Sequence, residues 1–197
     1  MKRERWYWAV FWDKTAPIPY ISSLEFIGTF DEQDFEQGCK VEGWKESYWI
    51  KSDCSETDGT PDDVLQNHLG IPIFSARLRE ALDRAKIIGI QYLPIGVLYS
   101  DGRSCNGFSI SNVTNIVPAI DMERSDYDRF PPDYFFVKDR GKISGLRKAV
   151  LKAEAIENYD IIRPQEYNVA IYVSRKFVSV FEDGDFTGCS FAEVELY

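Results

Sequence analysis

The sequence predicts an α+β protein with mixed or antiparallel sheets, few short helices and two similar helix–loop–strand units. The first observation is that residues 73–92 and 172–191 match each other without a gap in their pattern of apolar positions. The second is that segments rich in aromatic and β-branched residues, which favour strands, recur between Pro, Gly and polar clusters. Because these segments do not alternate regularly with helices, the pattern indicates α+β architecture.

The two matching stretches each predict the same three elements. A serine, Ser75 or Ser174, stands before apolar residues spaced i, i+3 and i+4, which predicts an N-cap followed by an amphipathic helix. A glycine, Gly89 or Gly188, then leads into alternating apolar residues, which predicts a loop and a half-buried strand. Neither stretch contains a nucleophile–base pair, a metal-ligand spacing or a phosphate loop. We therefore interpret the repeat as scaffold, which favours binding over catalysis.

The chain before the first repeat is predicted to form a strand-rich aromatic region, residues 1–68. Its strands can share a sheet with the α+β domain predicted over residues 69–197. Thr60 and Pro61 predict the start of a short helix that Gly70 ends. Strands are expected over residues 6–12, 24–30 and 41–50, and a polar surface loop is expected over residues 51–60.

The chain after the first predicted helix is expected to be mostly strands. A strand over residues 88–98, a tight turn at Asp101 and Gly102, and a return strand over residues 108–117 are predicted to form a hairpin. A brief strand is expected at residues 134–137. Residues 145–157 have helix propensity, but Val150 and Leu151 fit a strand equally well, and a short strand flanked by turns is the preferred prediction there. Residues 169–173 lead into the second helix–strand unit.

Composition limits the kind of partner. The 197-residue chain carries a net charge of −9, and phosphate contacts need clustered Lys and Arg, so nucleic acid is not expected. An acidic surface accelerates association with a basic protein, and we expect such a partner. No apolar run reaches the about 20 residues of a membrane helix, and the N-terminal apolar run lacks a small-residue cleavage site. We therefore expect a cytoplasmic protein without a membrane partner.

The candidates for catalysis and metal binding are few. His68 is the only histidine, so a Ser–His–Asp or a Cys–His site would have to use it. Cys54 is the candidate thiol for such a pair, but its acidic neighbours disfavour a thiolate. The four cysteines have neither zinc nor redox spacing and are expected to be reduced thiols. The carboxylates after Ile120 lack the glycine of a calcium loop, and Asp121 and Ser125 are expected to bond local backbone amides. No cofactor and no metal are therefore expected.

A partner-binding surface is predicted where aromatic strands lie beside the acidic loop. Aromatic residues are enriched among the interface residues that carry most of the binding energy, and an acidic rim favours a basic target. The alternative for each tryptophan is a place in the core, where large aromatic side chains contribute much of the burial. The predicted surface consists of Trp44, Trp49, Asp53, Glu56, Asp58, Asp62 and Asp63.

Several segments, taken in order, resemble a known family. Residues 112–125 combine a strand with an apolar residue, then Asp and, four positions later, Ser. The other segments are Tyr92-Leu93-Pro94-Ile95, Asp160-Ile161-Ile162-Arg163, Ile171-Tyr172-Val173-Ser174 and Thr187-Gly188-Cys189. Over about residues 70–197 this series resembles the eleventh immunity-protein family of bacterial polymorphic-toxin systems. No match to that family is identified in about the first 65 residues.

The resemblance implies a small cytoplasmic protein that binds and neutralises a cognate toxin delivered by a neighbouring cell. The family has no catalytic residues to transfer to this chain, and its members differ in the toxin they bind. Two alternatives from other classes stay open. One is a small-ligand or carbohydrate-binding module that uses an exposed tryptophan, and the other is a hydrolase built on Cys54 or His68.

Overall fold

The computed structural model describes residues 5–11, 25–26, 35, 37–44, 48–51, 62–67 and 70–197. The strands in these residues are β1 (Trp6–Val10), β2 (Glu25–Phe26), β3 (Trp49–Lys51), β4 (Ile73–Ser75), β5 (Ile90–Leu98), β6 (Ser104–Val113), β7 (Ile116–Val117), β8 (Asp126–Arg129), β9 (Ile143–Lys148), β10 (Val150–Leu151), β11 (Ile161–Pro164), β12 (Tyr172–Ser174) and β13 (Ser190–Leu196). The helices there are α2 (Ala76–Arg84), α3 (Ala153–Ile156), α4 (Arg175–Asp183) and the short 3-10 helix η2 (Val137–Asp139).

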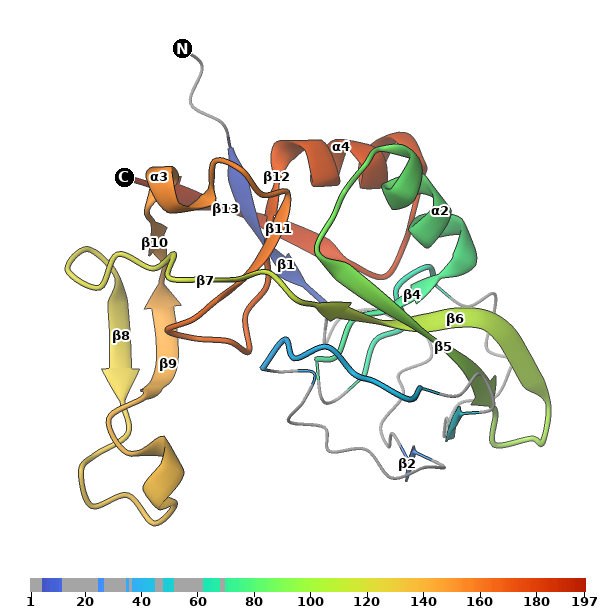
Figure 1. The fold of residues 1–197 in the computed structure, drawn as a ribbon, viewed down its shortest axis with the longest axis horizontal. Helices are drawn as coiled ribbons and strands as arrows, with labels where there is room; N and C mark the ends of the chain where they lie inside the picture. The colour runs from blue at the N-terminus through green and yellow to red at the C-terminus, as the bar shows by residue number, and fades with distance from the viewer. Residues whose placement is uncertain are drawn as a thin grey trace.

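Within the described residues the strands form two larger sheets and a separate hairpin (Figure 1). One sheet has the order β10-β13-β1-β12-β11-β7, and the other has the order β2-β3-β5-β6-β4. Most neighbours in these sheets are antiparallel, but three pairs are parallel: β3 with β5, β10 with β13, and β7 with β11. Mixed sheets with few short helices confirm the predicted α+β class.

The two predicted helix caps are confirmed. The Ser75 hydroxyl accepts a hydrogen bond from Leu78 N at 3.1 Å, and the Ser174 hydroxyl accepts one from Phe177 N at 3.3 Å. Each serine therefore satisfies an amide that the first helical turn leaves without an intrahelical partner. The loop and strand expected after each helix are present as well, ending in β5 and β13.

An aspartate upstream of each helix binds the cap serine in the same way. The Asp63 backbone oxygen accepts from Ser75 N at 2.7 Å, and its carboxylate accepts from Ser75 Oγ at 2.7 Å. Asp160 makes the same two bonds with Ser174, at 2.9 and 2.8 Å. A basic residue in the first turn of each helix also binds this carboxylate. The repeat therefore begins well before the stretch that the sequence pattern identified.

The sheets around the two helices have the same register. In what we call the α2 half (β3, β4, α2, β5 and β6), β6 pairs with β4 and β5 and places Phe108 opposite Ser75. In what we call the α4 half (β10, β12, α4, β13 and β1), β1 pairs with β12 and β13 and places Trp6 opposite Ser174. A parallel strand flanks each sheet on the far side, β3 in one half and β10 in the other. The duplication therefore covers whole sheets as well as the helices.

The counterparts β6 and β1 differ in their position along the chain. Strand β6 directly follows β5, whereas β1 precedes every other described strand and enters the α4 half from the start of the chain. The first strand thus completes the sheet that the last strand belongs to, with Trp6 opposite Val194 (Figure 1). The molecule is a permuted duplication. Strands β1 and β3 both pair with strands beyond residue 68, and the division of the chain at that residue stays a prediction.

Helices α2 and α4 share one apolar core between the two halves. Leu78 and Leu82 from α2 pack in the same cluster as Phe177 and Phe181 from α4. Side chains alternate across a strand, so the opposite face of each sheet holds a further apolar cluster. These two outer clusters occupy equivalent faces of the two halves.

Several predicted elements differ from the structure. The helix predicted after Pro61 is wrong for residues 62–67, where Val64 bridges Phe74 and is buried in the shared core. Pairing with β4 outweighs the local capping signals there. The strand predicted over residues 41–50 is limited to β3 within the described residues, and the one predicted over residues 134–137 is wrong, because a turn and η2 stand there.

The hairpin of β8 and β9 extends away from the rest of the fold (Figure 1). Arg147 on β9 bonds two aspartates on β8, donating from Nε to Asp126 Oδ2 at 2.9 Å and binding Asp128 as well. The sequence does not predict a strand at β8, because Asp126–Arg129 lies in an acidic stretch broken by proline. In this hairpin the two strands are held by ion pairs between β8 and β9 and by the turn that connects them, and not by a face of alternating apolar residues.

Candidate functional site

An open apolar surface of the α4 half lies on the outer face of its sheet. Strand β1 turns Tyr7 and Ala9 into the shared core and turns Trp6 and Trp8 to this outer face. Trp6 is fully covered, whereas Trp8 is 45% exposed. An exposed tryptophan in the middle of a strand that is otherwise largely buried marks this face as a candidate binding site.

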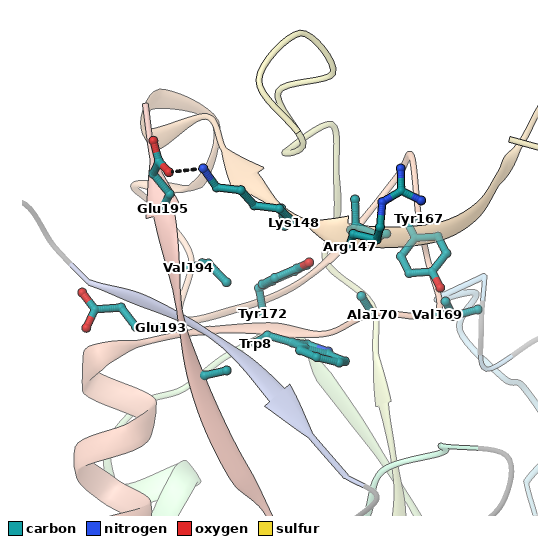
Figure 2. Close-up of a pocket in the computed structure, with 13 residues that line it drawn as sticks. Trp8, Arg147, Lys148, Tyr167, Val169, Ala170, Tyr172, Glu193, Val194 and Glu195 are labelled. Carbon is teal, nitrogen blue, oxygen red and sulfur yellow. Dashed lines mark ion pairs between the residues drawn. The ribbon is translucent and has the colours of Figure 1, made fainter. Parts of the chain in front are cut away.

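Trp8 lies in a groove of about 530 Å³, a volume typical of small-molecule and side-chain binding sites. The Trp8 groove lies between β1, β12, β13, the end of β9 and the loop before β12 (Figure 2). Its lining residues are Trp8, Leu146, Arg147, Lys148, Ala149, Tyr167, Val169, Ala170, Tyr172, Ala192, Glu193, Val194 and Glu195.

The floor of the Trp8 groove is apolar and uncharged. Trp8 lies opposite Tyr172 on one neighbouring strand and opposite Ala192 on the other. Burial, with a smaller contribution from Tyr167, raises the pKa of Tyr172 above its ordinary value. Burial raises the pKa of Tyr167 as well. Both phenols therefore stay neutral well into the alkaline range, and the floor favours an apolar occupant.

The charged residues at the rim of the Trp8 groove are paired within the chain. Lys148 Nζ lies 2.7 Å from Glu195 Oε2, the contact drawn as a dashed line in Figure 2. Arg147 is held by the aspartates of β8, and Glu193 lies 3.7 Å from Arg5. Exposed ion pairs contribute little to stability, but here they leave the rim close to neutral. The groove therefore offers burial of apolar surface more than an ionic contact.

The equivalent face of the α2 half is covered by the protein itself. The counterpart of Trp8 is Ile110, which lies opposite Ile73 and Leu93 and is fully buried. Phe35 and Trp44 pack in the same apolar cluster as these residues. Trp44 also donates from its indole nitrogen to Pro94 O at 2.7 Å. Aromatic side chains from a separate segment thus pack, in one half, in the apolar cluster around the residue whose counterpart, Trp8, stays exposed in the other half.

A second exposed apolar surface lies at the end of the β8–β9 hairpin. Phe135 is 84% exposed, and its neighbours Phe136 and Val137 are exposed as well. The two phenylalanine rings meet edge to face with centroids 5.1 Å apart. Exposed aromatic clusters of this kind are typical of protein-binding surfaces.

The two tryptophans of the predicted partner-binding surface are both half-buried. Trp44 packs on Phe35 and Tyr48 and binds the backbone of β5. The Trp49 ring lies across Gly96 so closely that a Cβ at that glycine would lie 2.3 Å from it. Both side chains therefore have a structural role in the α2 half, and a part in an interface stays a prediction.

The acidic members of the predicted surface divide into two groups. Asp62 and Asp63 are buried, and the Asp63 carboxylate binds Ser75, Arg77 and the backbone amide of Thr187. That carboxylate is thus engaged inside the protein. Asp53, Glu56 and Asp58 lie outside the described residues, as do Cys54 and His68 of the hydrolase hypothesis.

Of Asp121 and Ser125, both expected to bond local backbone amides, Asp121 alone does so. Asp121 Oδ1 accepts from the backbone amides of Glu123 and Arg124 at 3.0 and 3.2 Å, which confirms the predicted turn. The Ser125 hydroxyl instead accepts from Val150 N at 3.0 Å, across to β10. Among the residues that the structure describes, no cluster of His, Cys, Asp and Glu is placed to hold a metal ion.

Two further expectations concern the cysteine thiols and membrane-spanning helices. Cys39 and Cys189 are free thiols, and Cys105 Sγ donates to Asn106 O at 3.4 Å. Burial raises the pKa of the Cys189 thiol despite a backbone hydrogen bond that lowers it. No helix in the described part of the chain is long and apolar enough to cross a membrane.

The sequence was compared with models of known protein families. The model of an immunity protein family (Imm11) matches residues 7–196. The chain therefore belongs to the Imm11 immunity protein family, as the sequence resemblance indicated. The match also includes the N-terminal part where no resemblance was identified, which agrees with the place of β1 in the sheet of the α4 half. A comparison with curated proteins returned no match.

Proposed function

We propose that this chain is a cytoplasmic immunity protein that binds one cognate toxin and neutralises it without catalysing a reaction. The observation that carries the proposal is the match to an immunity protein family over residues 7–196. Occlusion is the mechanism we favour. A bound partner would cover the active site of the toxin or a surface that the toxin needs.

The charge of the chain supports a basic toxin. At a net charge of −9, long-range attraction would speed the encounter with a basic surface. We keep the acidic loop residues Asp53, Glu56 and Asp58 as steering contacts in this proposal. Reversal of all three to Lys should slow association at low salt and leave dissociation nearly unchanged, which stopped-flow measurements at two ionic strengths would show.

The experiment that tests the function is a rescue assay with the neighbouring genes. Each neighbouring open reading frame is expressed in a test bacterium with and without this chain, and the surviving cultures are used for co-purification. We expect one frame to stop growth alone, to be tolerated with this chain, and to elute with it as a complex. If no neighbour is toxic and nothing co-purifies, the proposal is wrong.

One observation favours the carbohydrate-binding alternative, namely an exposed Trp8 in a groove of small-molecule size. A sugar, however, is held by several polar groups that are free to hydrogen-bond, and the charged residues of this rim are already paired. Titration with oligosaccharides, followed by tryptophan fluorescence, separates the two functions. A saturable change without any protein partner would favour the carbohydrate module.

A further inference from the structure

We propose that the Trp8 groove is the docking site of the toxin, and that a bulky apolar side chain of the toxin, foremost an aromatic one, fills it. This inference rests on the proposed immunity function and adds to it the surface and the chemistry of recognition. The two halves of the duplicated fold can be compared directly, because aromatic side chains cover this site in one of them.

The covered half shows what this face accepts. In the α2 half, Ile110, Ile73 and Leu93 form the floor, and all three are buried. The cover consists of Phe35 and Trp44, which reach the face from a segment outside the sheet. The sheet register assigns Trp8, Tyr172 and Ala192 as the counterparts of those floor residues. The same backbone frame therefore receives Phe35 and Trp44 over its floor in one half, whereas Trp8 stays 45% exposed in the other, with Tyr167 at the wall of its groove.

The chemistry of the open face fits the same kind of occupant. Trp8, Val169 and Ala192 present exposed apolar surface, while Tyr172 is buried at the base of the groove. Lys148 and Glu195 neutralise each other at the rim, and Arg147 is bound by Asp126 and Asp128. A charged side chain entering the groove would lose hydration without gaining a free counter-charge. An aromatic or large aliphatic side chain would gain burial and would exclude water around Trp8.

The test uses the toxic product found by the rescue assay, with its active site inactivated, as the probe. Affinity for it is measured by calorimetry with the wild type, with Ala192→Arg and with Val169→Asp. Ala192→Arg fills the groove and Val169→Asp places a charge at its edge, and both positions are exposed, so the fold should persist. The matched control is Ile88→Asp, at an exposed apolar residue in the loop after α2. Thermal unfolding monitors each variant.

We expect each groove variant to weaken binding by about 30-fold or more, as truncation of a residue central to an interface does. Ile88→Asp should stay within about twofold of the wild type. The occupant is identified by alanine replacement of exposed aromatic and large aliphatic residues of the toxin. Alanine at the toxin residue that fills the groove should weaken binding to the wild-type immunity protein. The same toxin change should cause no further loss of affinity for the Ala192→Arg variant.

Several results would overturn the inference. Wild-type affinity in both folded groove variants would leave the immunity function in place and remove the groove from the interface. If toxin affinity falls only when Asp53, Glu56 and Asp58 are reversed in charge, the interface lies at the acidic loop. If it falls only when Phe135 is replaced, the interface lies at the end of the β8–β9 hairpin. A dimer of the free chain that Ala192→Arg dissociates would assign the groove to a second copy. If the wild type binds no toxin, the proposed function fails, and this inference fails with it.

Discussion

At the scale of single residues, Asp63 carries more contacts than any sequence pattern suggested. Its carboxylate receives hydrogen bonds from the cap serine, from the Arg77 guanidinium and, at 3.3 Å, from Thr187 N in the other half. Asp160 serves its own helix through Ser174 and Lys176. Asp63 therefore ties the two halves together, whereas its counterpart acts within one half.

The first prediction compares these two aspartates. Asp63→Ala should lower the free energy of unfolding by about 3 kcal/mol, because it removes charge-assisted bonds and leaves buried donors without acceptors. Asp160→Ala removes fewer bonds and should cost about 1 kcal/mol. Urea denaturation measures both. Equal losses would mean that the additional bonds of Asp63, from Arg77 and from Thr187 N, contribute nothing to stability.

The second prediction concerns a close approach of backbones at Gly188. This glycine has a φ of +91°, and a Cβ there would lie 2.1 Å from the Val64 carbonyl oxygen. Gly188→Ala should therefore cost about 3 kcal/mol or more, from backbone strain and overpacking together. Gly102 is the control, because it has a similar φ of +83° but open space around it. Gly102→Ala should cost only about 1 kcal/mol, and a similar loss at both positions would contradict the packing argument.

At the scale of elements, the sequence predicted well where the signals are local. The caps at Ser75 and Ser174 and the turn at Asp101 and Gly102 depend on neighbouring residues, and the structure has all of them. The β8–β9 hairpin was not predicted, since its strands are held by ion pairs across the pair rather than by apolar alternation. Elements that are stabilised by residues distant in the sequence cannot be predicted from a local sequence pattern.

The third prediction tests the ion pairs of this hairpin. Hydrogen bonds from Arg147 lower the pKa of Asp126 below its ordinary value of 3.8, against a smaller opposing effect of desolvation. Because the pKa of Asp126 is lower in the folded state, the pair stabilises the hairpin at every pH above the ordinary pKa. This stabilisation is lost as the pH falls through the pKa of the folded state. Arg147→Met should raise the Asp126 pKa, as an NMR titration of its carboxyl carbon would show.

The control for that titration is Arg129→Met. Arg129 donates to the backbone oxygen of Gly141 and is not paired with Asp126. Its replacement should leave the Asp126 pKa where the wild type has it. An Asp126 pKa that does not respond to Arg147→Met would show that the pair does not form in solution.

At the scale of the whole molecule, the permuted duplication explains both the fold and the open groove. The sequence showed the repeat of helix, loop and strand, but the two strands that complete the sheets, β6 and β1, share no visible pattern. The binding candidate was missed for the same reason. Every residue of β1 looks suited to a core, and only the register with β12 and β13 shows that Trp8 faces outward.

The fourth prediction follows from the position of β1. Removal of residues 1–11 takes away the buried Trp6, Tyr7, Ala9 and Phe11 and should unfold the chain, because each large buried side chain contributes about 3–5 kcal/mol. Attachment of the same residues after Tyr197 through a short Gly-Ser linker should restore the fold. The counterpart β6 already follows β5 in this way.

Circular dichroism and urea denaturation of this permuted chain provide the measurement. Its free energy of unfolding should lie within about 2 kcal/mol of the wild type, because the entropy of closing a loop depends weakly on loop length. A permuted chain that stays unfolded would contradict the equivalence of β1 and β6.

The measurement that tests the central claim most directly is photo-cross-linking in cells that express the toxin. A photoreactive amino acid is placed at Val169, on the Trp8 groove, or at Ile88, away from it; both side chains are exposed. The account predicts a cross-linked product with the mass of this chain plus the toxin from position 169 and none from position 88. The account would be contradicted if the toxin cross-linked only to position 88. It would also be contradicted if position 169 gave no cross-link to the toxin in cells that the protein protects.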